Sequence, residues 1–379
     1  MPEYALGAFL ARWYPTTRHD LAASESETWN VPDLLALAQP DDEQRWQELH
    51  LGYTNPRGAH WLRERIAQGY DRIDADHIIN FAGAQEALGL TLRALLGWDD
   101  HAIIVLPAYQ PSEVALTVLC ETTGVALGAA QGWMLDLECI EAAIRPNTRV
   151  ILINFPNNPT GKLISRGVLD DLIAICRRHG IWLVNDEVYR LIDRNPAHRL
   201  PCVADAYERG VSIDALSKSM GLPGLRVGWM ACRDSQVVER SNQLKQIASQ
   251  CLSAPSEVLA HIALGAAETL LARNRAIAAR NLIELERLLS DHEAQFDWVR
   301  PDGGVGGYIR YCGSGGVEAF ATRLAREAGV LVLPSSVWRS SLATLPDDRF
   351  RVGFGRQNCP AAFDAWRAAM QTPQARSAA

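Results

Sequence analysis

The segment ALSKSMGLPGLRVGWM (215–230) places a single lysine, Lys218, between two serines on a glycine-rich turn, and Arg226 follows eight residues later. A lysine amine that can lose its proton is a nucleophile, and a neighbouring cation favours that loss. The planar guanidinium of an arginine suits a phosphate or a carboxylate. Glycines allow the backbone to approach a bound group closely. These residue types predict a reactive amine beside an anion-binding group.

The middle of the chain alternates short apolar segments with a segment of helical spacing. Residues 149–155, 181–189 and 211–219 have the length and apolar content of buried β-strands. Residues 167–180 have the apolar spacing of a helix and end at a glycine. Strand, helix and strand in this order predict right-handed parallel βαβ units, and fully apolar strands predict a sheet covered on both faces.

Two further polar residues precede Lys218 at similar intervals. Asn158 lies in NFPNNPTG and Asp186 in NDEVYR, so the intervals are 28 and 32 residues (186 − 158 and 218 − 186). Each interval is about one βαβ unit, which places all three residues near the ends of neighbouring parallel strands. Open α/β sheets bind ligands at the carboxyl edge of their strands. We therefore expect the three side chains to lie side by side in a binding site there.

The pattern changes after residue 250. Residues 268–292 have the spacing of a long amphipathic helix, and short strand-like segments with one further helix follow. We expect a large α/β domain at 45–275 and a smaller α+β domain at 276–379, with 1–44 packed on the smaller one. The last residues, 371–379, are expected to be disordered.

Composition excludes several classes of function. The net charge is −7 and no basic block occurs, so we expect no nucleic-acid partner. The apolar segments are too short to span a membrane, and the N-terminus lacks the pattern of a signal peptide. The eight cysteines form no CxxC pair and the nine histidines no HExxH motif, so we expect no metal site. Scattered cysteines within apolar segments indicate buried thiols in the cytoplasm.

The motifs around Asn158, Asp186 and Lys218 occur in the same order as LGYTNPRG (51–58), NFAGAQEALGLTL (80–92), LPAYQPS (106–112) and RFRVGFGR (349–356). This series resembles the class I and II aminotransferases of fold type I, which use pyridoxal 5′-phosphate (PLP). The resemblance extends from about residue 50 to 356. It implies an aspartate aminotransferase-like α/β fold, in which helices cover both faces of a mostly parallel central sheet and a smaller α+β domain follows.

The resemblance also implies roles for individual residues around the cofactor ring. Lys218 forms a Schiff base with the PLP aldehyde and later acts as the base. Asp186 pairs with the pyridine nitrogen and keeps it protonated. Tyr189 and Asn158 contact the phenolic oxygen of the ring. Tyr109 stacks on the face of the ring and counts among the catalytic residues.

The phosphate site is implied by a second group of residues. Arg226 binds the phosphate, and so do the backbone amides of Gly83, Ala84 and Gln85 at a helix N-terminus. Many family members have Ser or Thr three residues before the lysine, whereas this chain has Ala215. Ser217 or Ser219 is expected to compensate for the lost hydroxyl.

Two residues are matched to the substrate and to a second subunit. Arg351 matches the arginine that binds the α-carboxylate of the amino-acid substrate, with Arg349 and Arg356 as alternatives. Tyr53 matches a tyrosine that reaches the phosphate of the neighbouring subunit, which implies a homodimer with a shared active site.

The reaction stays open at this stage. Transamination of an L-amino acid with a 2-oxo acid is the first interpretation. The resemblance extends to a branch near capreomycidine synthase, so elimination, cyclisation or carbon–carbon bond formation in natural-product metabolism is the alternative. A PLP-sensing regulator is disfavoured because no DNA-binding domain precedes the motifs, and a Rossmann dehydrogenase because no GxGxxG follows an early strand.

Overall fold

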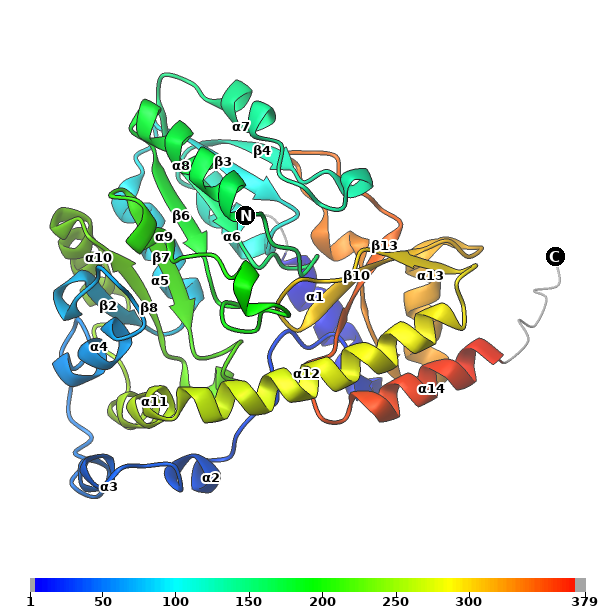
Figure 1. Ribbon diagram of the computed structural model, residues 1–379, viewed down its shortest axis with the longest axis horizontal. Coiled ribbons are helices and arrows are strands. Elements are labelled where there is room, and N and C mark those ends of the chain that lie inside the picture. Colours follow the sequence, from blue (N-terminus) through cyan, green and yellow to red (C-terminus); the bar gives the residue numbers. More distant parts are fainter. Residues whose placement is uncertain (1–3, 372–379) are drawn as a thin grey trace.

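A computed structural model describes residues 4–371, so the tail expected to be disordered lies outside the described residues apart from Gln371. Its large part is built on a central sheet, and its small part on a second sheet joined to the first by a long helix (Figure 1). None of the helices in residues 4–371 has both the length and the apolar content needed to cross a membrane.

The central sheet has seven strands in the order β2-β8-β7-β6-β5-β3-β4. The strands from β7 to β4 are parallel, whereas β8 is antiparallel to both of its neighbours. The expectation of a mostly parallel sheet is confirmed. The strands are β2 (Ile78–Phe81), β3 (His101–Leu106), β4 (Glu121–Ala126), β5 (Thr148–Asn154), β6 (Trp182–Asp186), β7 (Gly210–Ala215) and β8 (Gly228–Cys232).

Helices cover both faces of this sheet, because alternate side chains of each strand point to opposite sides. Val150 and Leu152 pack in one apolar cluster, while Ile151 and Ile153 pack in another. The helices of the large part are α4 (His60–Ala67), α5 (Ala84–Leu95), α6 (Gln110–Thr117), α7 (Leu137–Ala143), α8 (Arg166–His179), α9 (Val203–Ala206), α10 (Ser235–Ala248) and α11 (Ala254–Gly265).

Two strands are shorter than the sequence pattern predicts. The segment 181–189 forms a strand only to Asp186, and the segment 211–219 only to Ala215. Beyond β6 the chain turns, with the N–H of Arg190 donating to the carbonyl of Glu187 (2.7 Å). Apolar content continues past both strand ends because the turns are buried as well. Asp186 therefore lies at the end of a strand, and Lys218 lies in the turn that follows one.

The small part packs a second sheet against helices. Its strands follow the order β12-β13-β10-β9, all antiparallel. Phe296, Phe320, Phe350 and Trp366 form its aromatic core. The elements are α12 (Ala267–Ser290), β9 (Phe296–Trp298), β10 (Gly306–Tyr311), α13 (Gly316–Arg323), a π-helical turn (Leu324–Ala328), β11 (Val330–Leu331), β12 (Leu333–Pro334), β13 (Arg349–Gly353) and α14 (Cys359–Gln371).

The N-terminal segment contacts both parts of the molecule. It contains α1 (Ala5–Trp13), β1 (His19–Asp20), α2 (Val31–Leu35) and α3 (Pro40–Gln47). Strand β1 pairs in parallel with β11 of the small part, whereas α2 and α3 contact α11 of the large part. The division at residues 44 and 275 stays a proposal, and residue 275 lies inside the long helix α12.

Candidate active site

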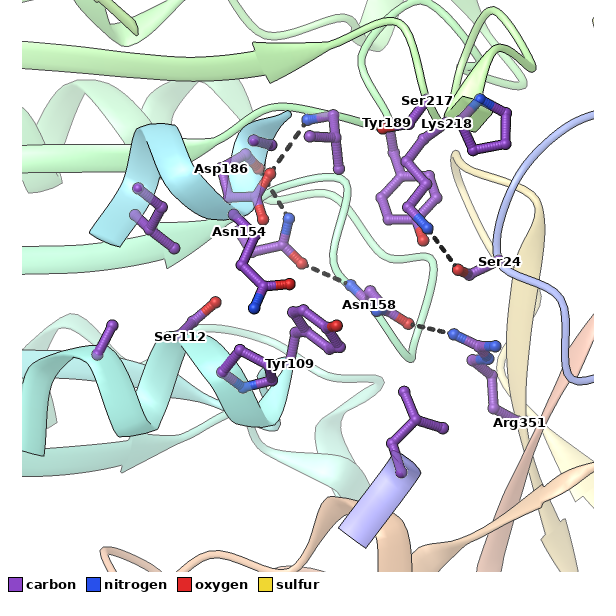
Figure 2. Close-up of a pocket in the computed structure, with 18 of the residues that line it drawn as sticks. Ser24, Tyr109, Ser112, Asn154, Asn158, Asp186, Tyr189, Ser217, Lys218 and Arg351 are labelled. Atoms are coloured by element: carbon purple, nitrogen blue, oxygen red, sulfur yellow. Dashed lines mark hydrogen bonds between the residues drawn. The ribbon is translucent and has the colours of Figure 1, made fainter. Parts of the chain in front are cut away.

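A cavity of about 230 Å³ opens at the carboxyl ends of β5, β6 and β7 (Figure 2). Segments from both parts of the molecule and from the N-terminal segment line it. Most of the residues singled out in the sequence meet here: Ala84, Gln85, Tyr109, Asn158, Asp186, Tyr189, Ser217, Lys218, Arg226 and Arg351.

The three residues at βαβ spacing lie at or just beyond the carboxyl ends of adjacent strands. Asp186 is the last residue of β6, Lys218 comes three residues after β7, and Asn158 four residues after β5. Because β5, β6 and β7 are parallel neighbours, their carboxyl ends meet at one edge of the sheet. Asn158 and Lys218, 60 positions apart in sequence (218 − 158), thus share one cavity.

Asp186 is a buried carboxylate held by its surroundings. Burial raises its pKa to about 6, and the nearby Lys218 and a hydrogen bond from the Val188 N–H (3.3 Å) oppose that rise. Asn154 fixes the backbone beside it: its Nδ2 donates to the carbonyl of Asp186 (2.7 Å), and its Oδ1 accepts from the N–H of Asn158 (2.8 Å). A carboxylate that lacks solvent favours a cationic partner such as a protonated ring nitrogen.

Lys218 is buried in a strongly charged environment. Burial lowers the pKa of its amine, and the cations Arg351 and Arg226 lower it further, while the carboxylates of Glu25 and Asp186 oppose the shift. Its Nζ donates to Oγ of Ser24 at 2.6 Å. A lowered pKa gives the neutral amine that a nucleophile or base requires.

The start of helix α5 forms the anion-binding end of the cavity. Ala84 and Gln85 lie in the first turn, where backbone N–H groups have no intrahelical acceptor. A Cβ at Gly228 would lie 2.6 Å from the N atom of Ala84, so glycine is required for β8 to approach this turn. Arg226 lies over Gly83 and donates to the carbonyl of Ala82 (3.1 Å).

The three expected amide ligands of the phosphate have different surroundings. Gly83 is the N-cap residue of α5, with φ at +93°, and its N–H donates to the carbonyl of Phe81 at 2.7 Å. The amides of Ala84 and Gln85 follow in the first turn of the helix. Ser217 lines the cavity, whereas Ser219 is buried and does not line it, so Ser217 is the better placed of the two serines to offer a hydroxyl.

Arg351 enters the cavity from β13 of the small part. Its Nη1 donates to Oδ1 of Asn158 (3.0 Å), and its Nη2 donates to the carbonyl of Ala22. Burial lowers the pKa of this guanidinium. The two alternative arginines have other partners: Arg349 stacks over a tryptophan ring, with 5.0 Å to the centroid, and Arg356 pairs with a glutamate.

The three tyrosines expected at the site have different surroundings. Tyr109 lines the cavity, and its hydroxyl is 2.7 Å from that of Tyr4 in the N-terminal segment. Tyr189 is buried in the cavity wall, and burial raises its pKa to about 12. Tyr53 does not line the cavity, and its side chain is 85% exposed.

Sequence reasoning missed three polar residues of the site, Ser24, Ser112 and Asn154. Asn154 is the last residue of β5, so the same strand-end argument that selected Asp186 could have found it. Ser24 comes from a segment 194 residues away from Lys218, and no spacing in the sequence connects the two.

Comparison with known proteins gives the family. The sequence model of the class I and II aminotransferases matches residues 23–360. Arginine–pyruvate transaminase of Pseudomonas aeruginosa is 30% identical over 306 residues, which cover 77% of this chain and 76% of that protein. Capreomycidine synthase of Streptomyces vinaceus is 29% identical over 373 residues, which cover 95% and 90% respectively.

Solved structures agree with this assignment. A PLP-dependent aminotransferase from Streptococcus suis superposes with a TM-score of 0.90 at 26% identity, and the match covers 97% of both chains. The PLP-dependent cyclase OrfR has a TM-score of 0.86 at 24% identity, which shows a shared fold. The chain belongs to the class I and II aminotransferase family and is a PLP-dependent enzyme.

The residues of the cavity fit PLP. An amine with a lowered pKa, Lys218, is available for the aldehyde, and the buried carboxylate of Asp186 is available for the ring nitrogen. The first turn of α5 and the guanidinium of Arg226 provide the positive end that a phosphate needs.

Asp186→Asn is expected to stabilise the PLP-free chain at pH 8, by about 1–3 kcal/mol. The folded-state pKa of about 6 lies above the ordinary 3.8, so the folded state prefers the protonated carboxyl. The contribution of Asp186 to stability therefore falls as the pH rises from about 4 to 6, and the amide avoids this loss. Urea unfolding at pH 5 and pH 8 measures the difference.

With PLP present, Asp186→Asn should instead lower the stability relative to the wild type, because the amide cannot hold the ring nitrogen protonated. Titration with PLP should show weaker binding to the Asn variant than to the wild type. A variant that is no more stable than the wild type at pH 8, or that binds PLP as tightly, would contradict this account of Asp186.

Proposed function

We propose that this enzyme transfers the amino group of a free L-amino acid to a 2-oxo acid, with Lys218 as the residue that binds PLP and moves the substrate proton. The observation that carries the proposal is the position of Asp186 and Lys218 at the carboxyl ends of the adjacent parallel strands β6 and β7, with Arg351 entering the same cavity from the small part. Family membership supports the same chemistry.

Bound PLP supplies an electron sink that acidifies the Cα–H bond of an attached amino acid. Asp186 would hold a proton at the ring nitrogen, and Tyr189 would donate to the phenolic oxygen. Because Oδ1 of Asn158 accepts from Arg351, its Nδ2 is the end that would donate to that same oxygen. Arg226 and the first turn of α5 would bind the phosphate. The amine of Lys218 would take the proton from Cα of the substrate and hold it for return.

Arg351 orients the substrate through its α-carboxylate. Two parallel hydrogen bonds from a planar guanidinium fix both the position and the rotation of a carboxylate. This orientation sets the Cα–H bond perpendicular to the ring and close to the amine of Lys218. The buried Nε of Arg351 has no hydrogen-bond partner among the described residues, so part of the donor capacity of this guanidinium is unused.

Elimination or cyclisation in natural-product metabolism is the second candidate. The observation that favours it is the match to capreomycidine synthase, which extends over 95% of this chain. The same base and electron sink serve both reactions, so identification of the products is needed to distinguish transamination from elimination or cyclisation. Mass spectrometry should be applied to a panel of amino acids, with and without pyruvate as acceptor, starting from the arginine and pyruvate of the named relative.

Lys218→Ala is expected to abolish both product formation and covalent capture of PLP. Borohydride should fix the cofactor to the wild-type chain. Peptide mass spectrometry should locate it at Lys218, because Lys218 is the lysine that lines the cavity. The matched control is Lys245→Ala, a second buried lysine whose Nζ donates to the carbonyl of Pro56. Capture of PLP on the Lys218→Ala variant would overturn the assignment.

Arg351→Lys is expected to reduce the rate of Cα–deuterium exchange in heavy water, by an amount equivalent to about 2 kcal/mol or more. The variant keeps the charge but loses the planar fork, so the substrate binds less tightly and is less well oriented. PLP affinity should persist because Arg226 lies at the phosphate end. Arg349→Lys is the control, since Arg349 stacks on Trp133 instead.

Exchange by Arg351→Lys at the wild-type rate, with unchanged dependence on substrate concentration, would show that Arg351 does not bind the carboxylate. The exchange assay is independent of the product, so this result would hold for transamination and for cyclisation alike.

We also propose a homodimer in which Tyr53 reaches the cavity of the partner. The 85% exposure of Tyr53 and the exposure of Leu51 and Ile247 support it. The Thr54 hydroxyl donates to the carbonyl of Leu252, so the segment of Leu51 and Tyr53 contacts the chain that follows α10. A partner subunit would cover exposed apolar side chains of this size.

Mixing Tyr53→Ala and Lys218→Ala subunits is expected to restore part of the activity that each variant lacks alone, because a mixed dimer contains one intact shared site. Analytical ultracentrifugation provides the oligomeric state. A fully active monomer would refute the shared site.

We propose the cytoplasm as the location. All eight cysteines are free thiols, and five of them are buried, a pattern that supports a reducing compartment.

A further inference from the structure

We propose that Ser24 is a positioning residue for Lys218: its hydroxyl fixes the amine in the direction from which it takes and returns the substrate proton. The inference rests on the proposed role of Lys218 as the base. It adds a residue from outside the large α/β part to the machinery of proton transfer.

The contact itself is short and partly buried. Nζ of Lys218 donates to Oγ of Ser24 at 2.6 Å, and Figure 2 shows the two side chains pointing toward each other. Ser24 also lies close enough to Tyr189 to oppose the rise that burial causes in the pKa of that phenol. Ser24 therefore contacts the amine of Lys218 and lies beside Tyr189 in the wall of the same cavity.

The backbone of Ser24 belongs to residues 20–28, which we call the N-terminal strap. The N–H of Gly353 donates to the carbonyl of Leu21 (2.7 Å), and Arg351 donates to the carbonyl of Ala22. These two bonds attach the strap to β13 of the small part on one side of Ser24.

On the other side of Ser24, the strap is attached to the catalytic turn. The N–H of Ser26 donates to the carbonyl of Lys218 (3.1 Å), and Glu25 forms an ion pair with Arg356. The Ser24 N–H donates to the Glu25 carboxylate (3.1 Å). With its backbone held on both sides, the Ser24 hydroxyl is a fixed point in the cavity.

A lysine needs such a fixed point because its four-carbon stem is flexible. A neutral amine that donates one N–H to Ser24 has its lone pair restricted to the remaining directions, which face the cavity. Once the amine has taken a proton, the hydrogen bond to Ser24 becomes charge-assisted and stronger. Ser24 therefore orients the base and stabilises its protonated form.

Other hydroxyls do not replace Ser24. Ser217 and Ser219 flank Lys218 in sequence, but neither bonds its amine in the described part of the chain, where Ser24 is the partner of Nζ. Ser26, two residues along the strap, is fully buried, and its Oγ has no hydrogen-bond partner within residues 4–371. Ser26→Ala is therefore a matched control that alters the strap without touching the amine.

The first test uses the full-length chain prepared without PLP. The rate at which acetic anhydride labels Lys218 is followed against pH by peptide mass spectrometry, and its midpoint reports the pKa of the amine. Ser24→Ala should lower that midpoint by about 0.5–1 pH unit, because the lost acceptor favoured the charged form. Ser24→Thr and Ser26→Ala should keep the wild-type midpoint.

The second test uses the holoenzyme and the amino acid with the fastest Cα exchange. Ser24→Ala should lower kcat about 10- to 100-fold with a small change in KM, and it should raise the isotope effect of Cα-deuterated substrate on kcat. Ser24→Thr should recover most of the rate, since it restores the hydroxyl.

An unchanged Lys218 midpoint in Ser24→Ala overturns the proposal, and so does an equal loss of rate in Ser24→Ala and Ser24→Thr. Circular dichroism separates either result from misfolding, and the Thr variant still decides the question if the Ala variant does not fold. The labelling test requires no catalysis, so this proposal can fail while the proposed function stands. Failure of the proposed function would be seen separately, because Lys218 would then not capture PLP.

Discussion

The parallel pairing of β6 with β7 is the constraint on which the site depends. This pairing matches Asp186 with Ile213 and places the turn that bears Lys218 beside the end of β6. A slip of one residue in β6 would turn Asp186 to the opposite face of the sheet, because strand side chains alternate. Alternating burial on two apolar faces fixes the register, so the hydrophobic core also determines the geometry of the chemical groups.

Charge is distributed in the cavity so that no ionised group is isolated. The carboxylates of Glu25 and Asp186 and the guanidiniums of Arg351 and Arg226 all act on the amine of Lys218. Burial destabilises the charges of Asp186, Lys218 and Arg351, and attraction between opposite charges offsets only part of that cost. The unbalanced part appears as shifted pKa values, and it favours binding of a cofactor with a cationic ring and an anionic phosphate.

The N-terminal strap connects the two parts of the molecule through this site. Its carbonyls accept hydrogen bonds from Gly353 and Arg351 of β13, while Ser26 and Ser24 bond the turn of Lys218. A movement of β13 relative to the large sheet would therefore displace Arg351, which is proposed to hold the substrate carboxylate. Through the strap, it would also displace Ser24 relative to Lys218, the proposed base. This coupling comes from direct hydrogen bonds, so it needs no long pathway through the core.

The sequence by itself determined the mostly parallel sheet and the placement of Asn158, Asp186 and Lys218 at one edge, since apolar periodicity and βαβ spacing are local properties. It overestimated the lengths of two strands because buried turns are as apolar as strands. Only the tertiary structure decided that Arg351 lies in the cavity and that Ser24 meets Lys218, since these contacts span 193 and 194 residues. The physical reason is that contacts between separate layers depend on how the layers pack, which the spacing of residues within one segment does not encode.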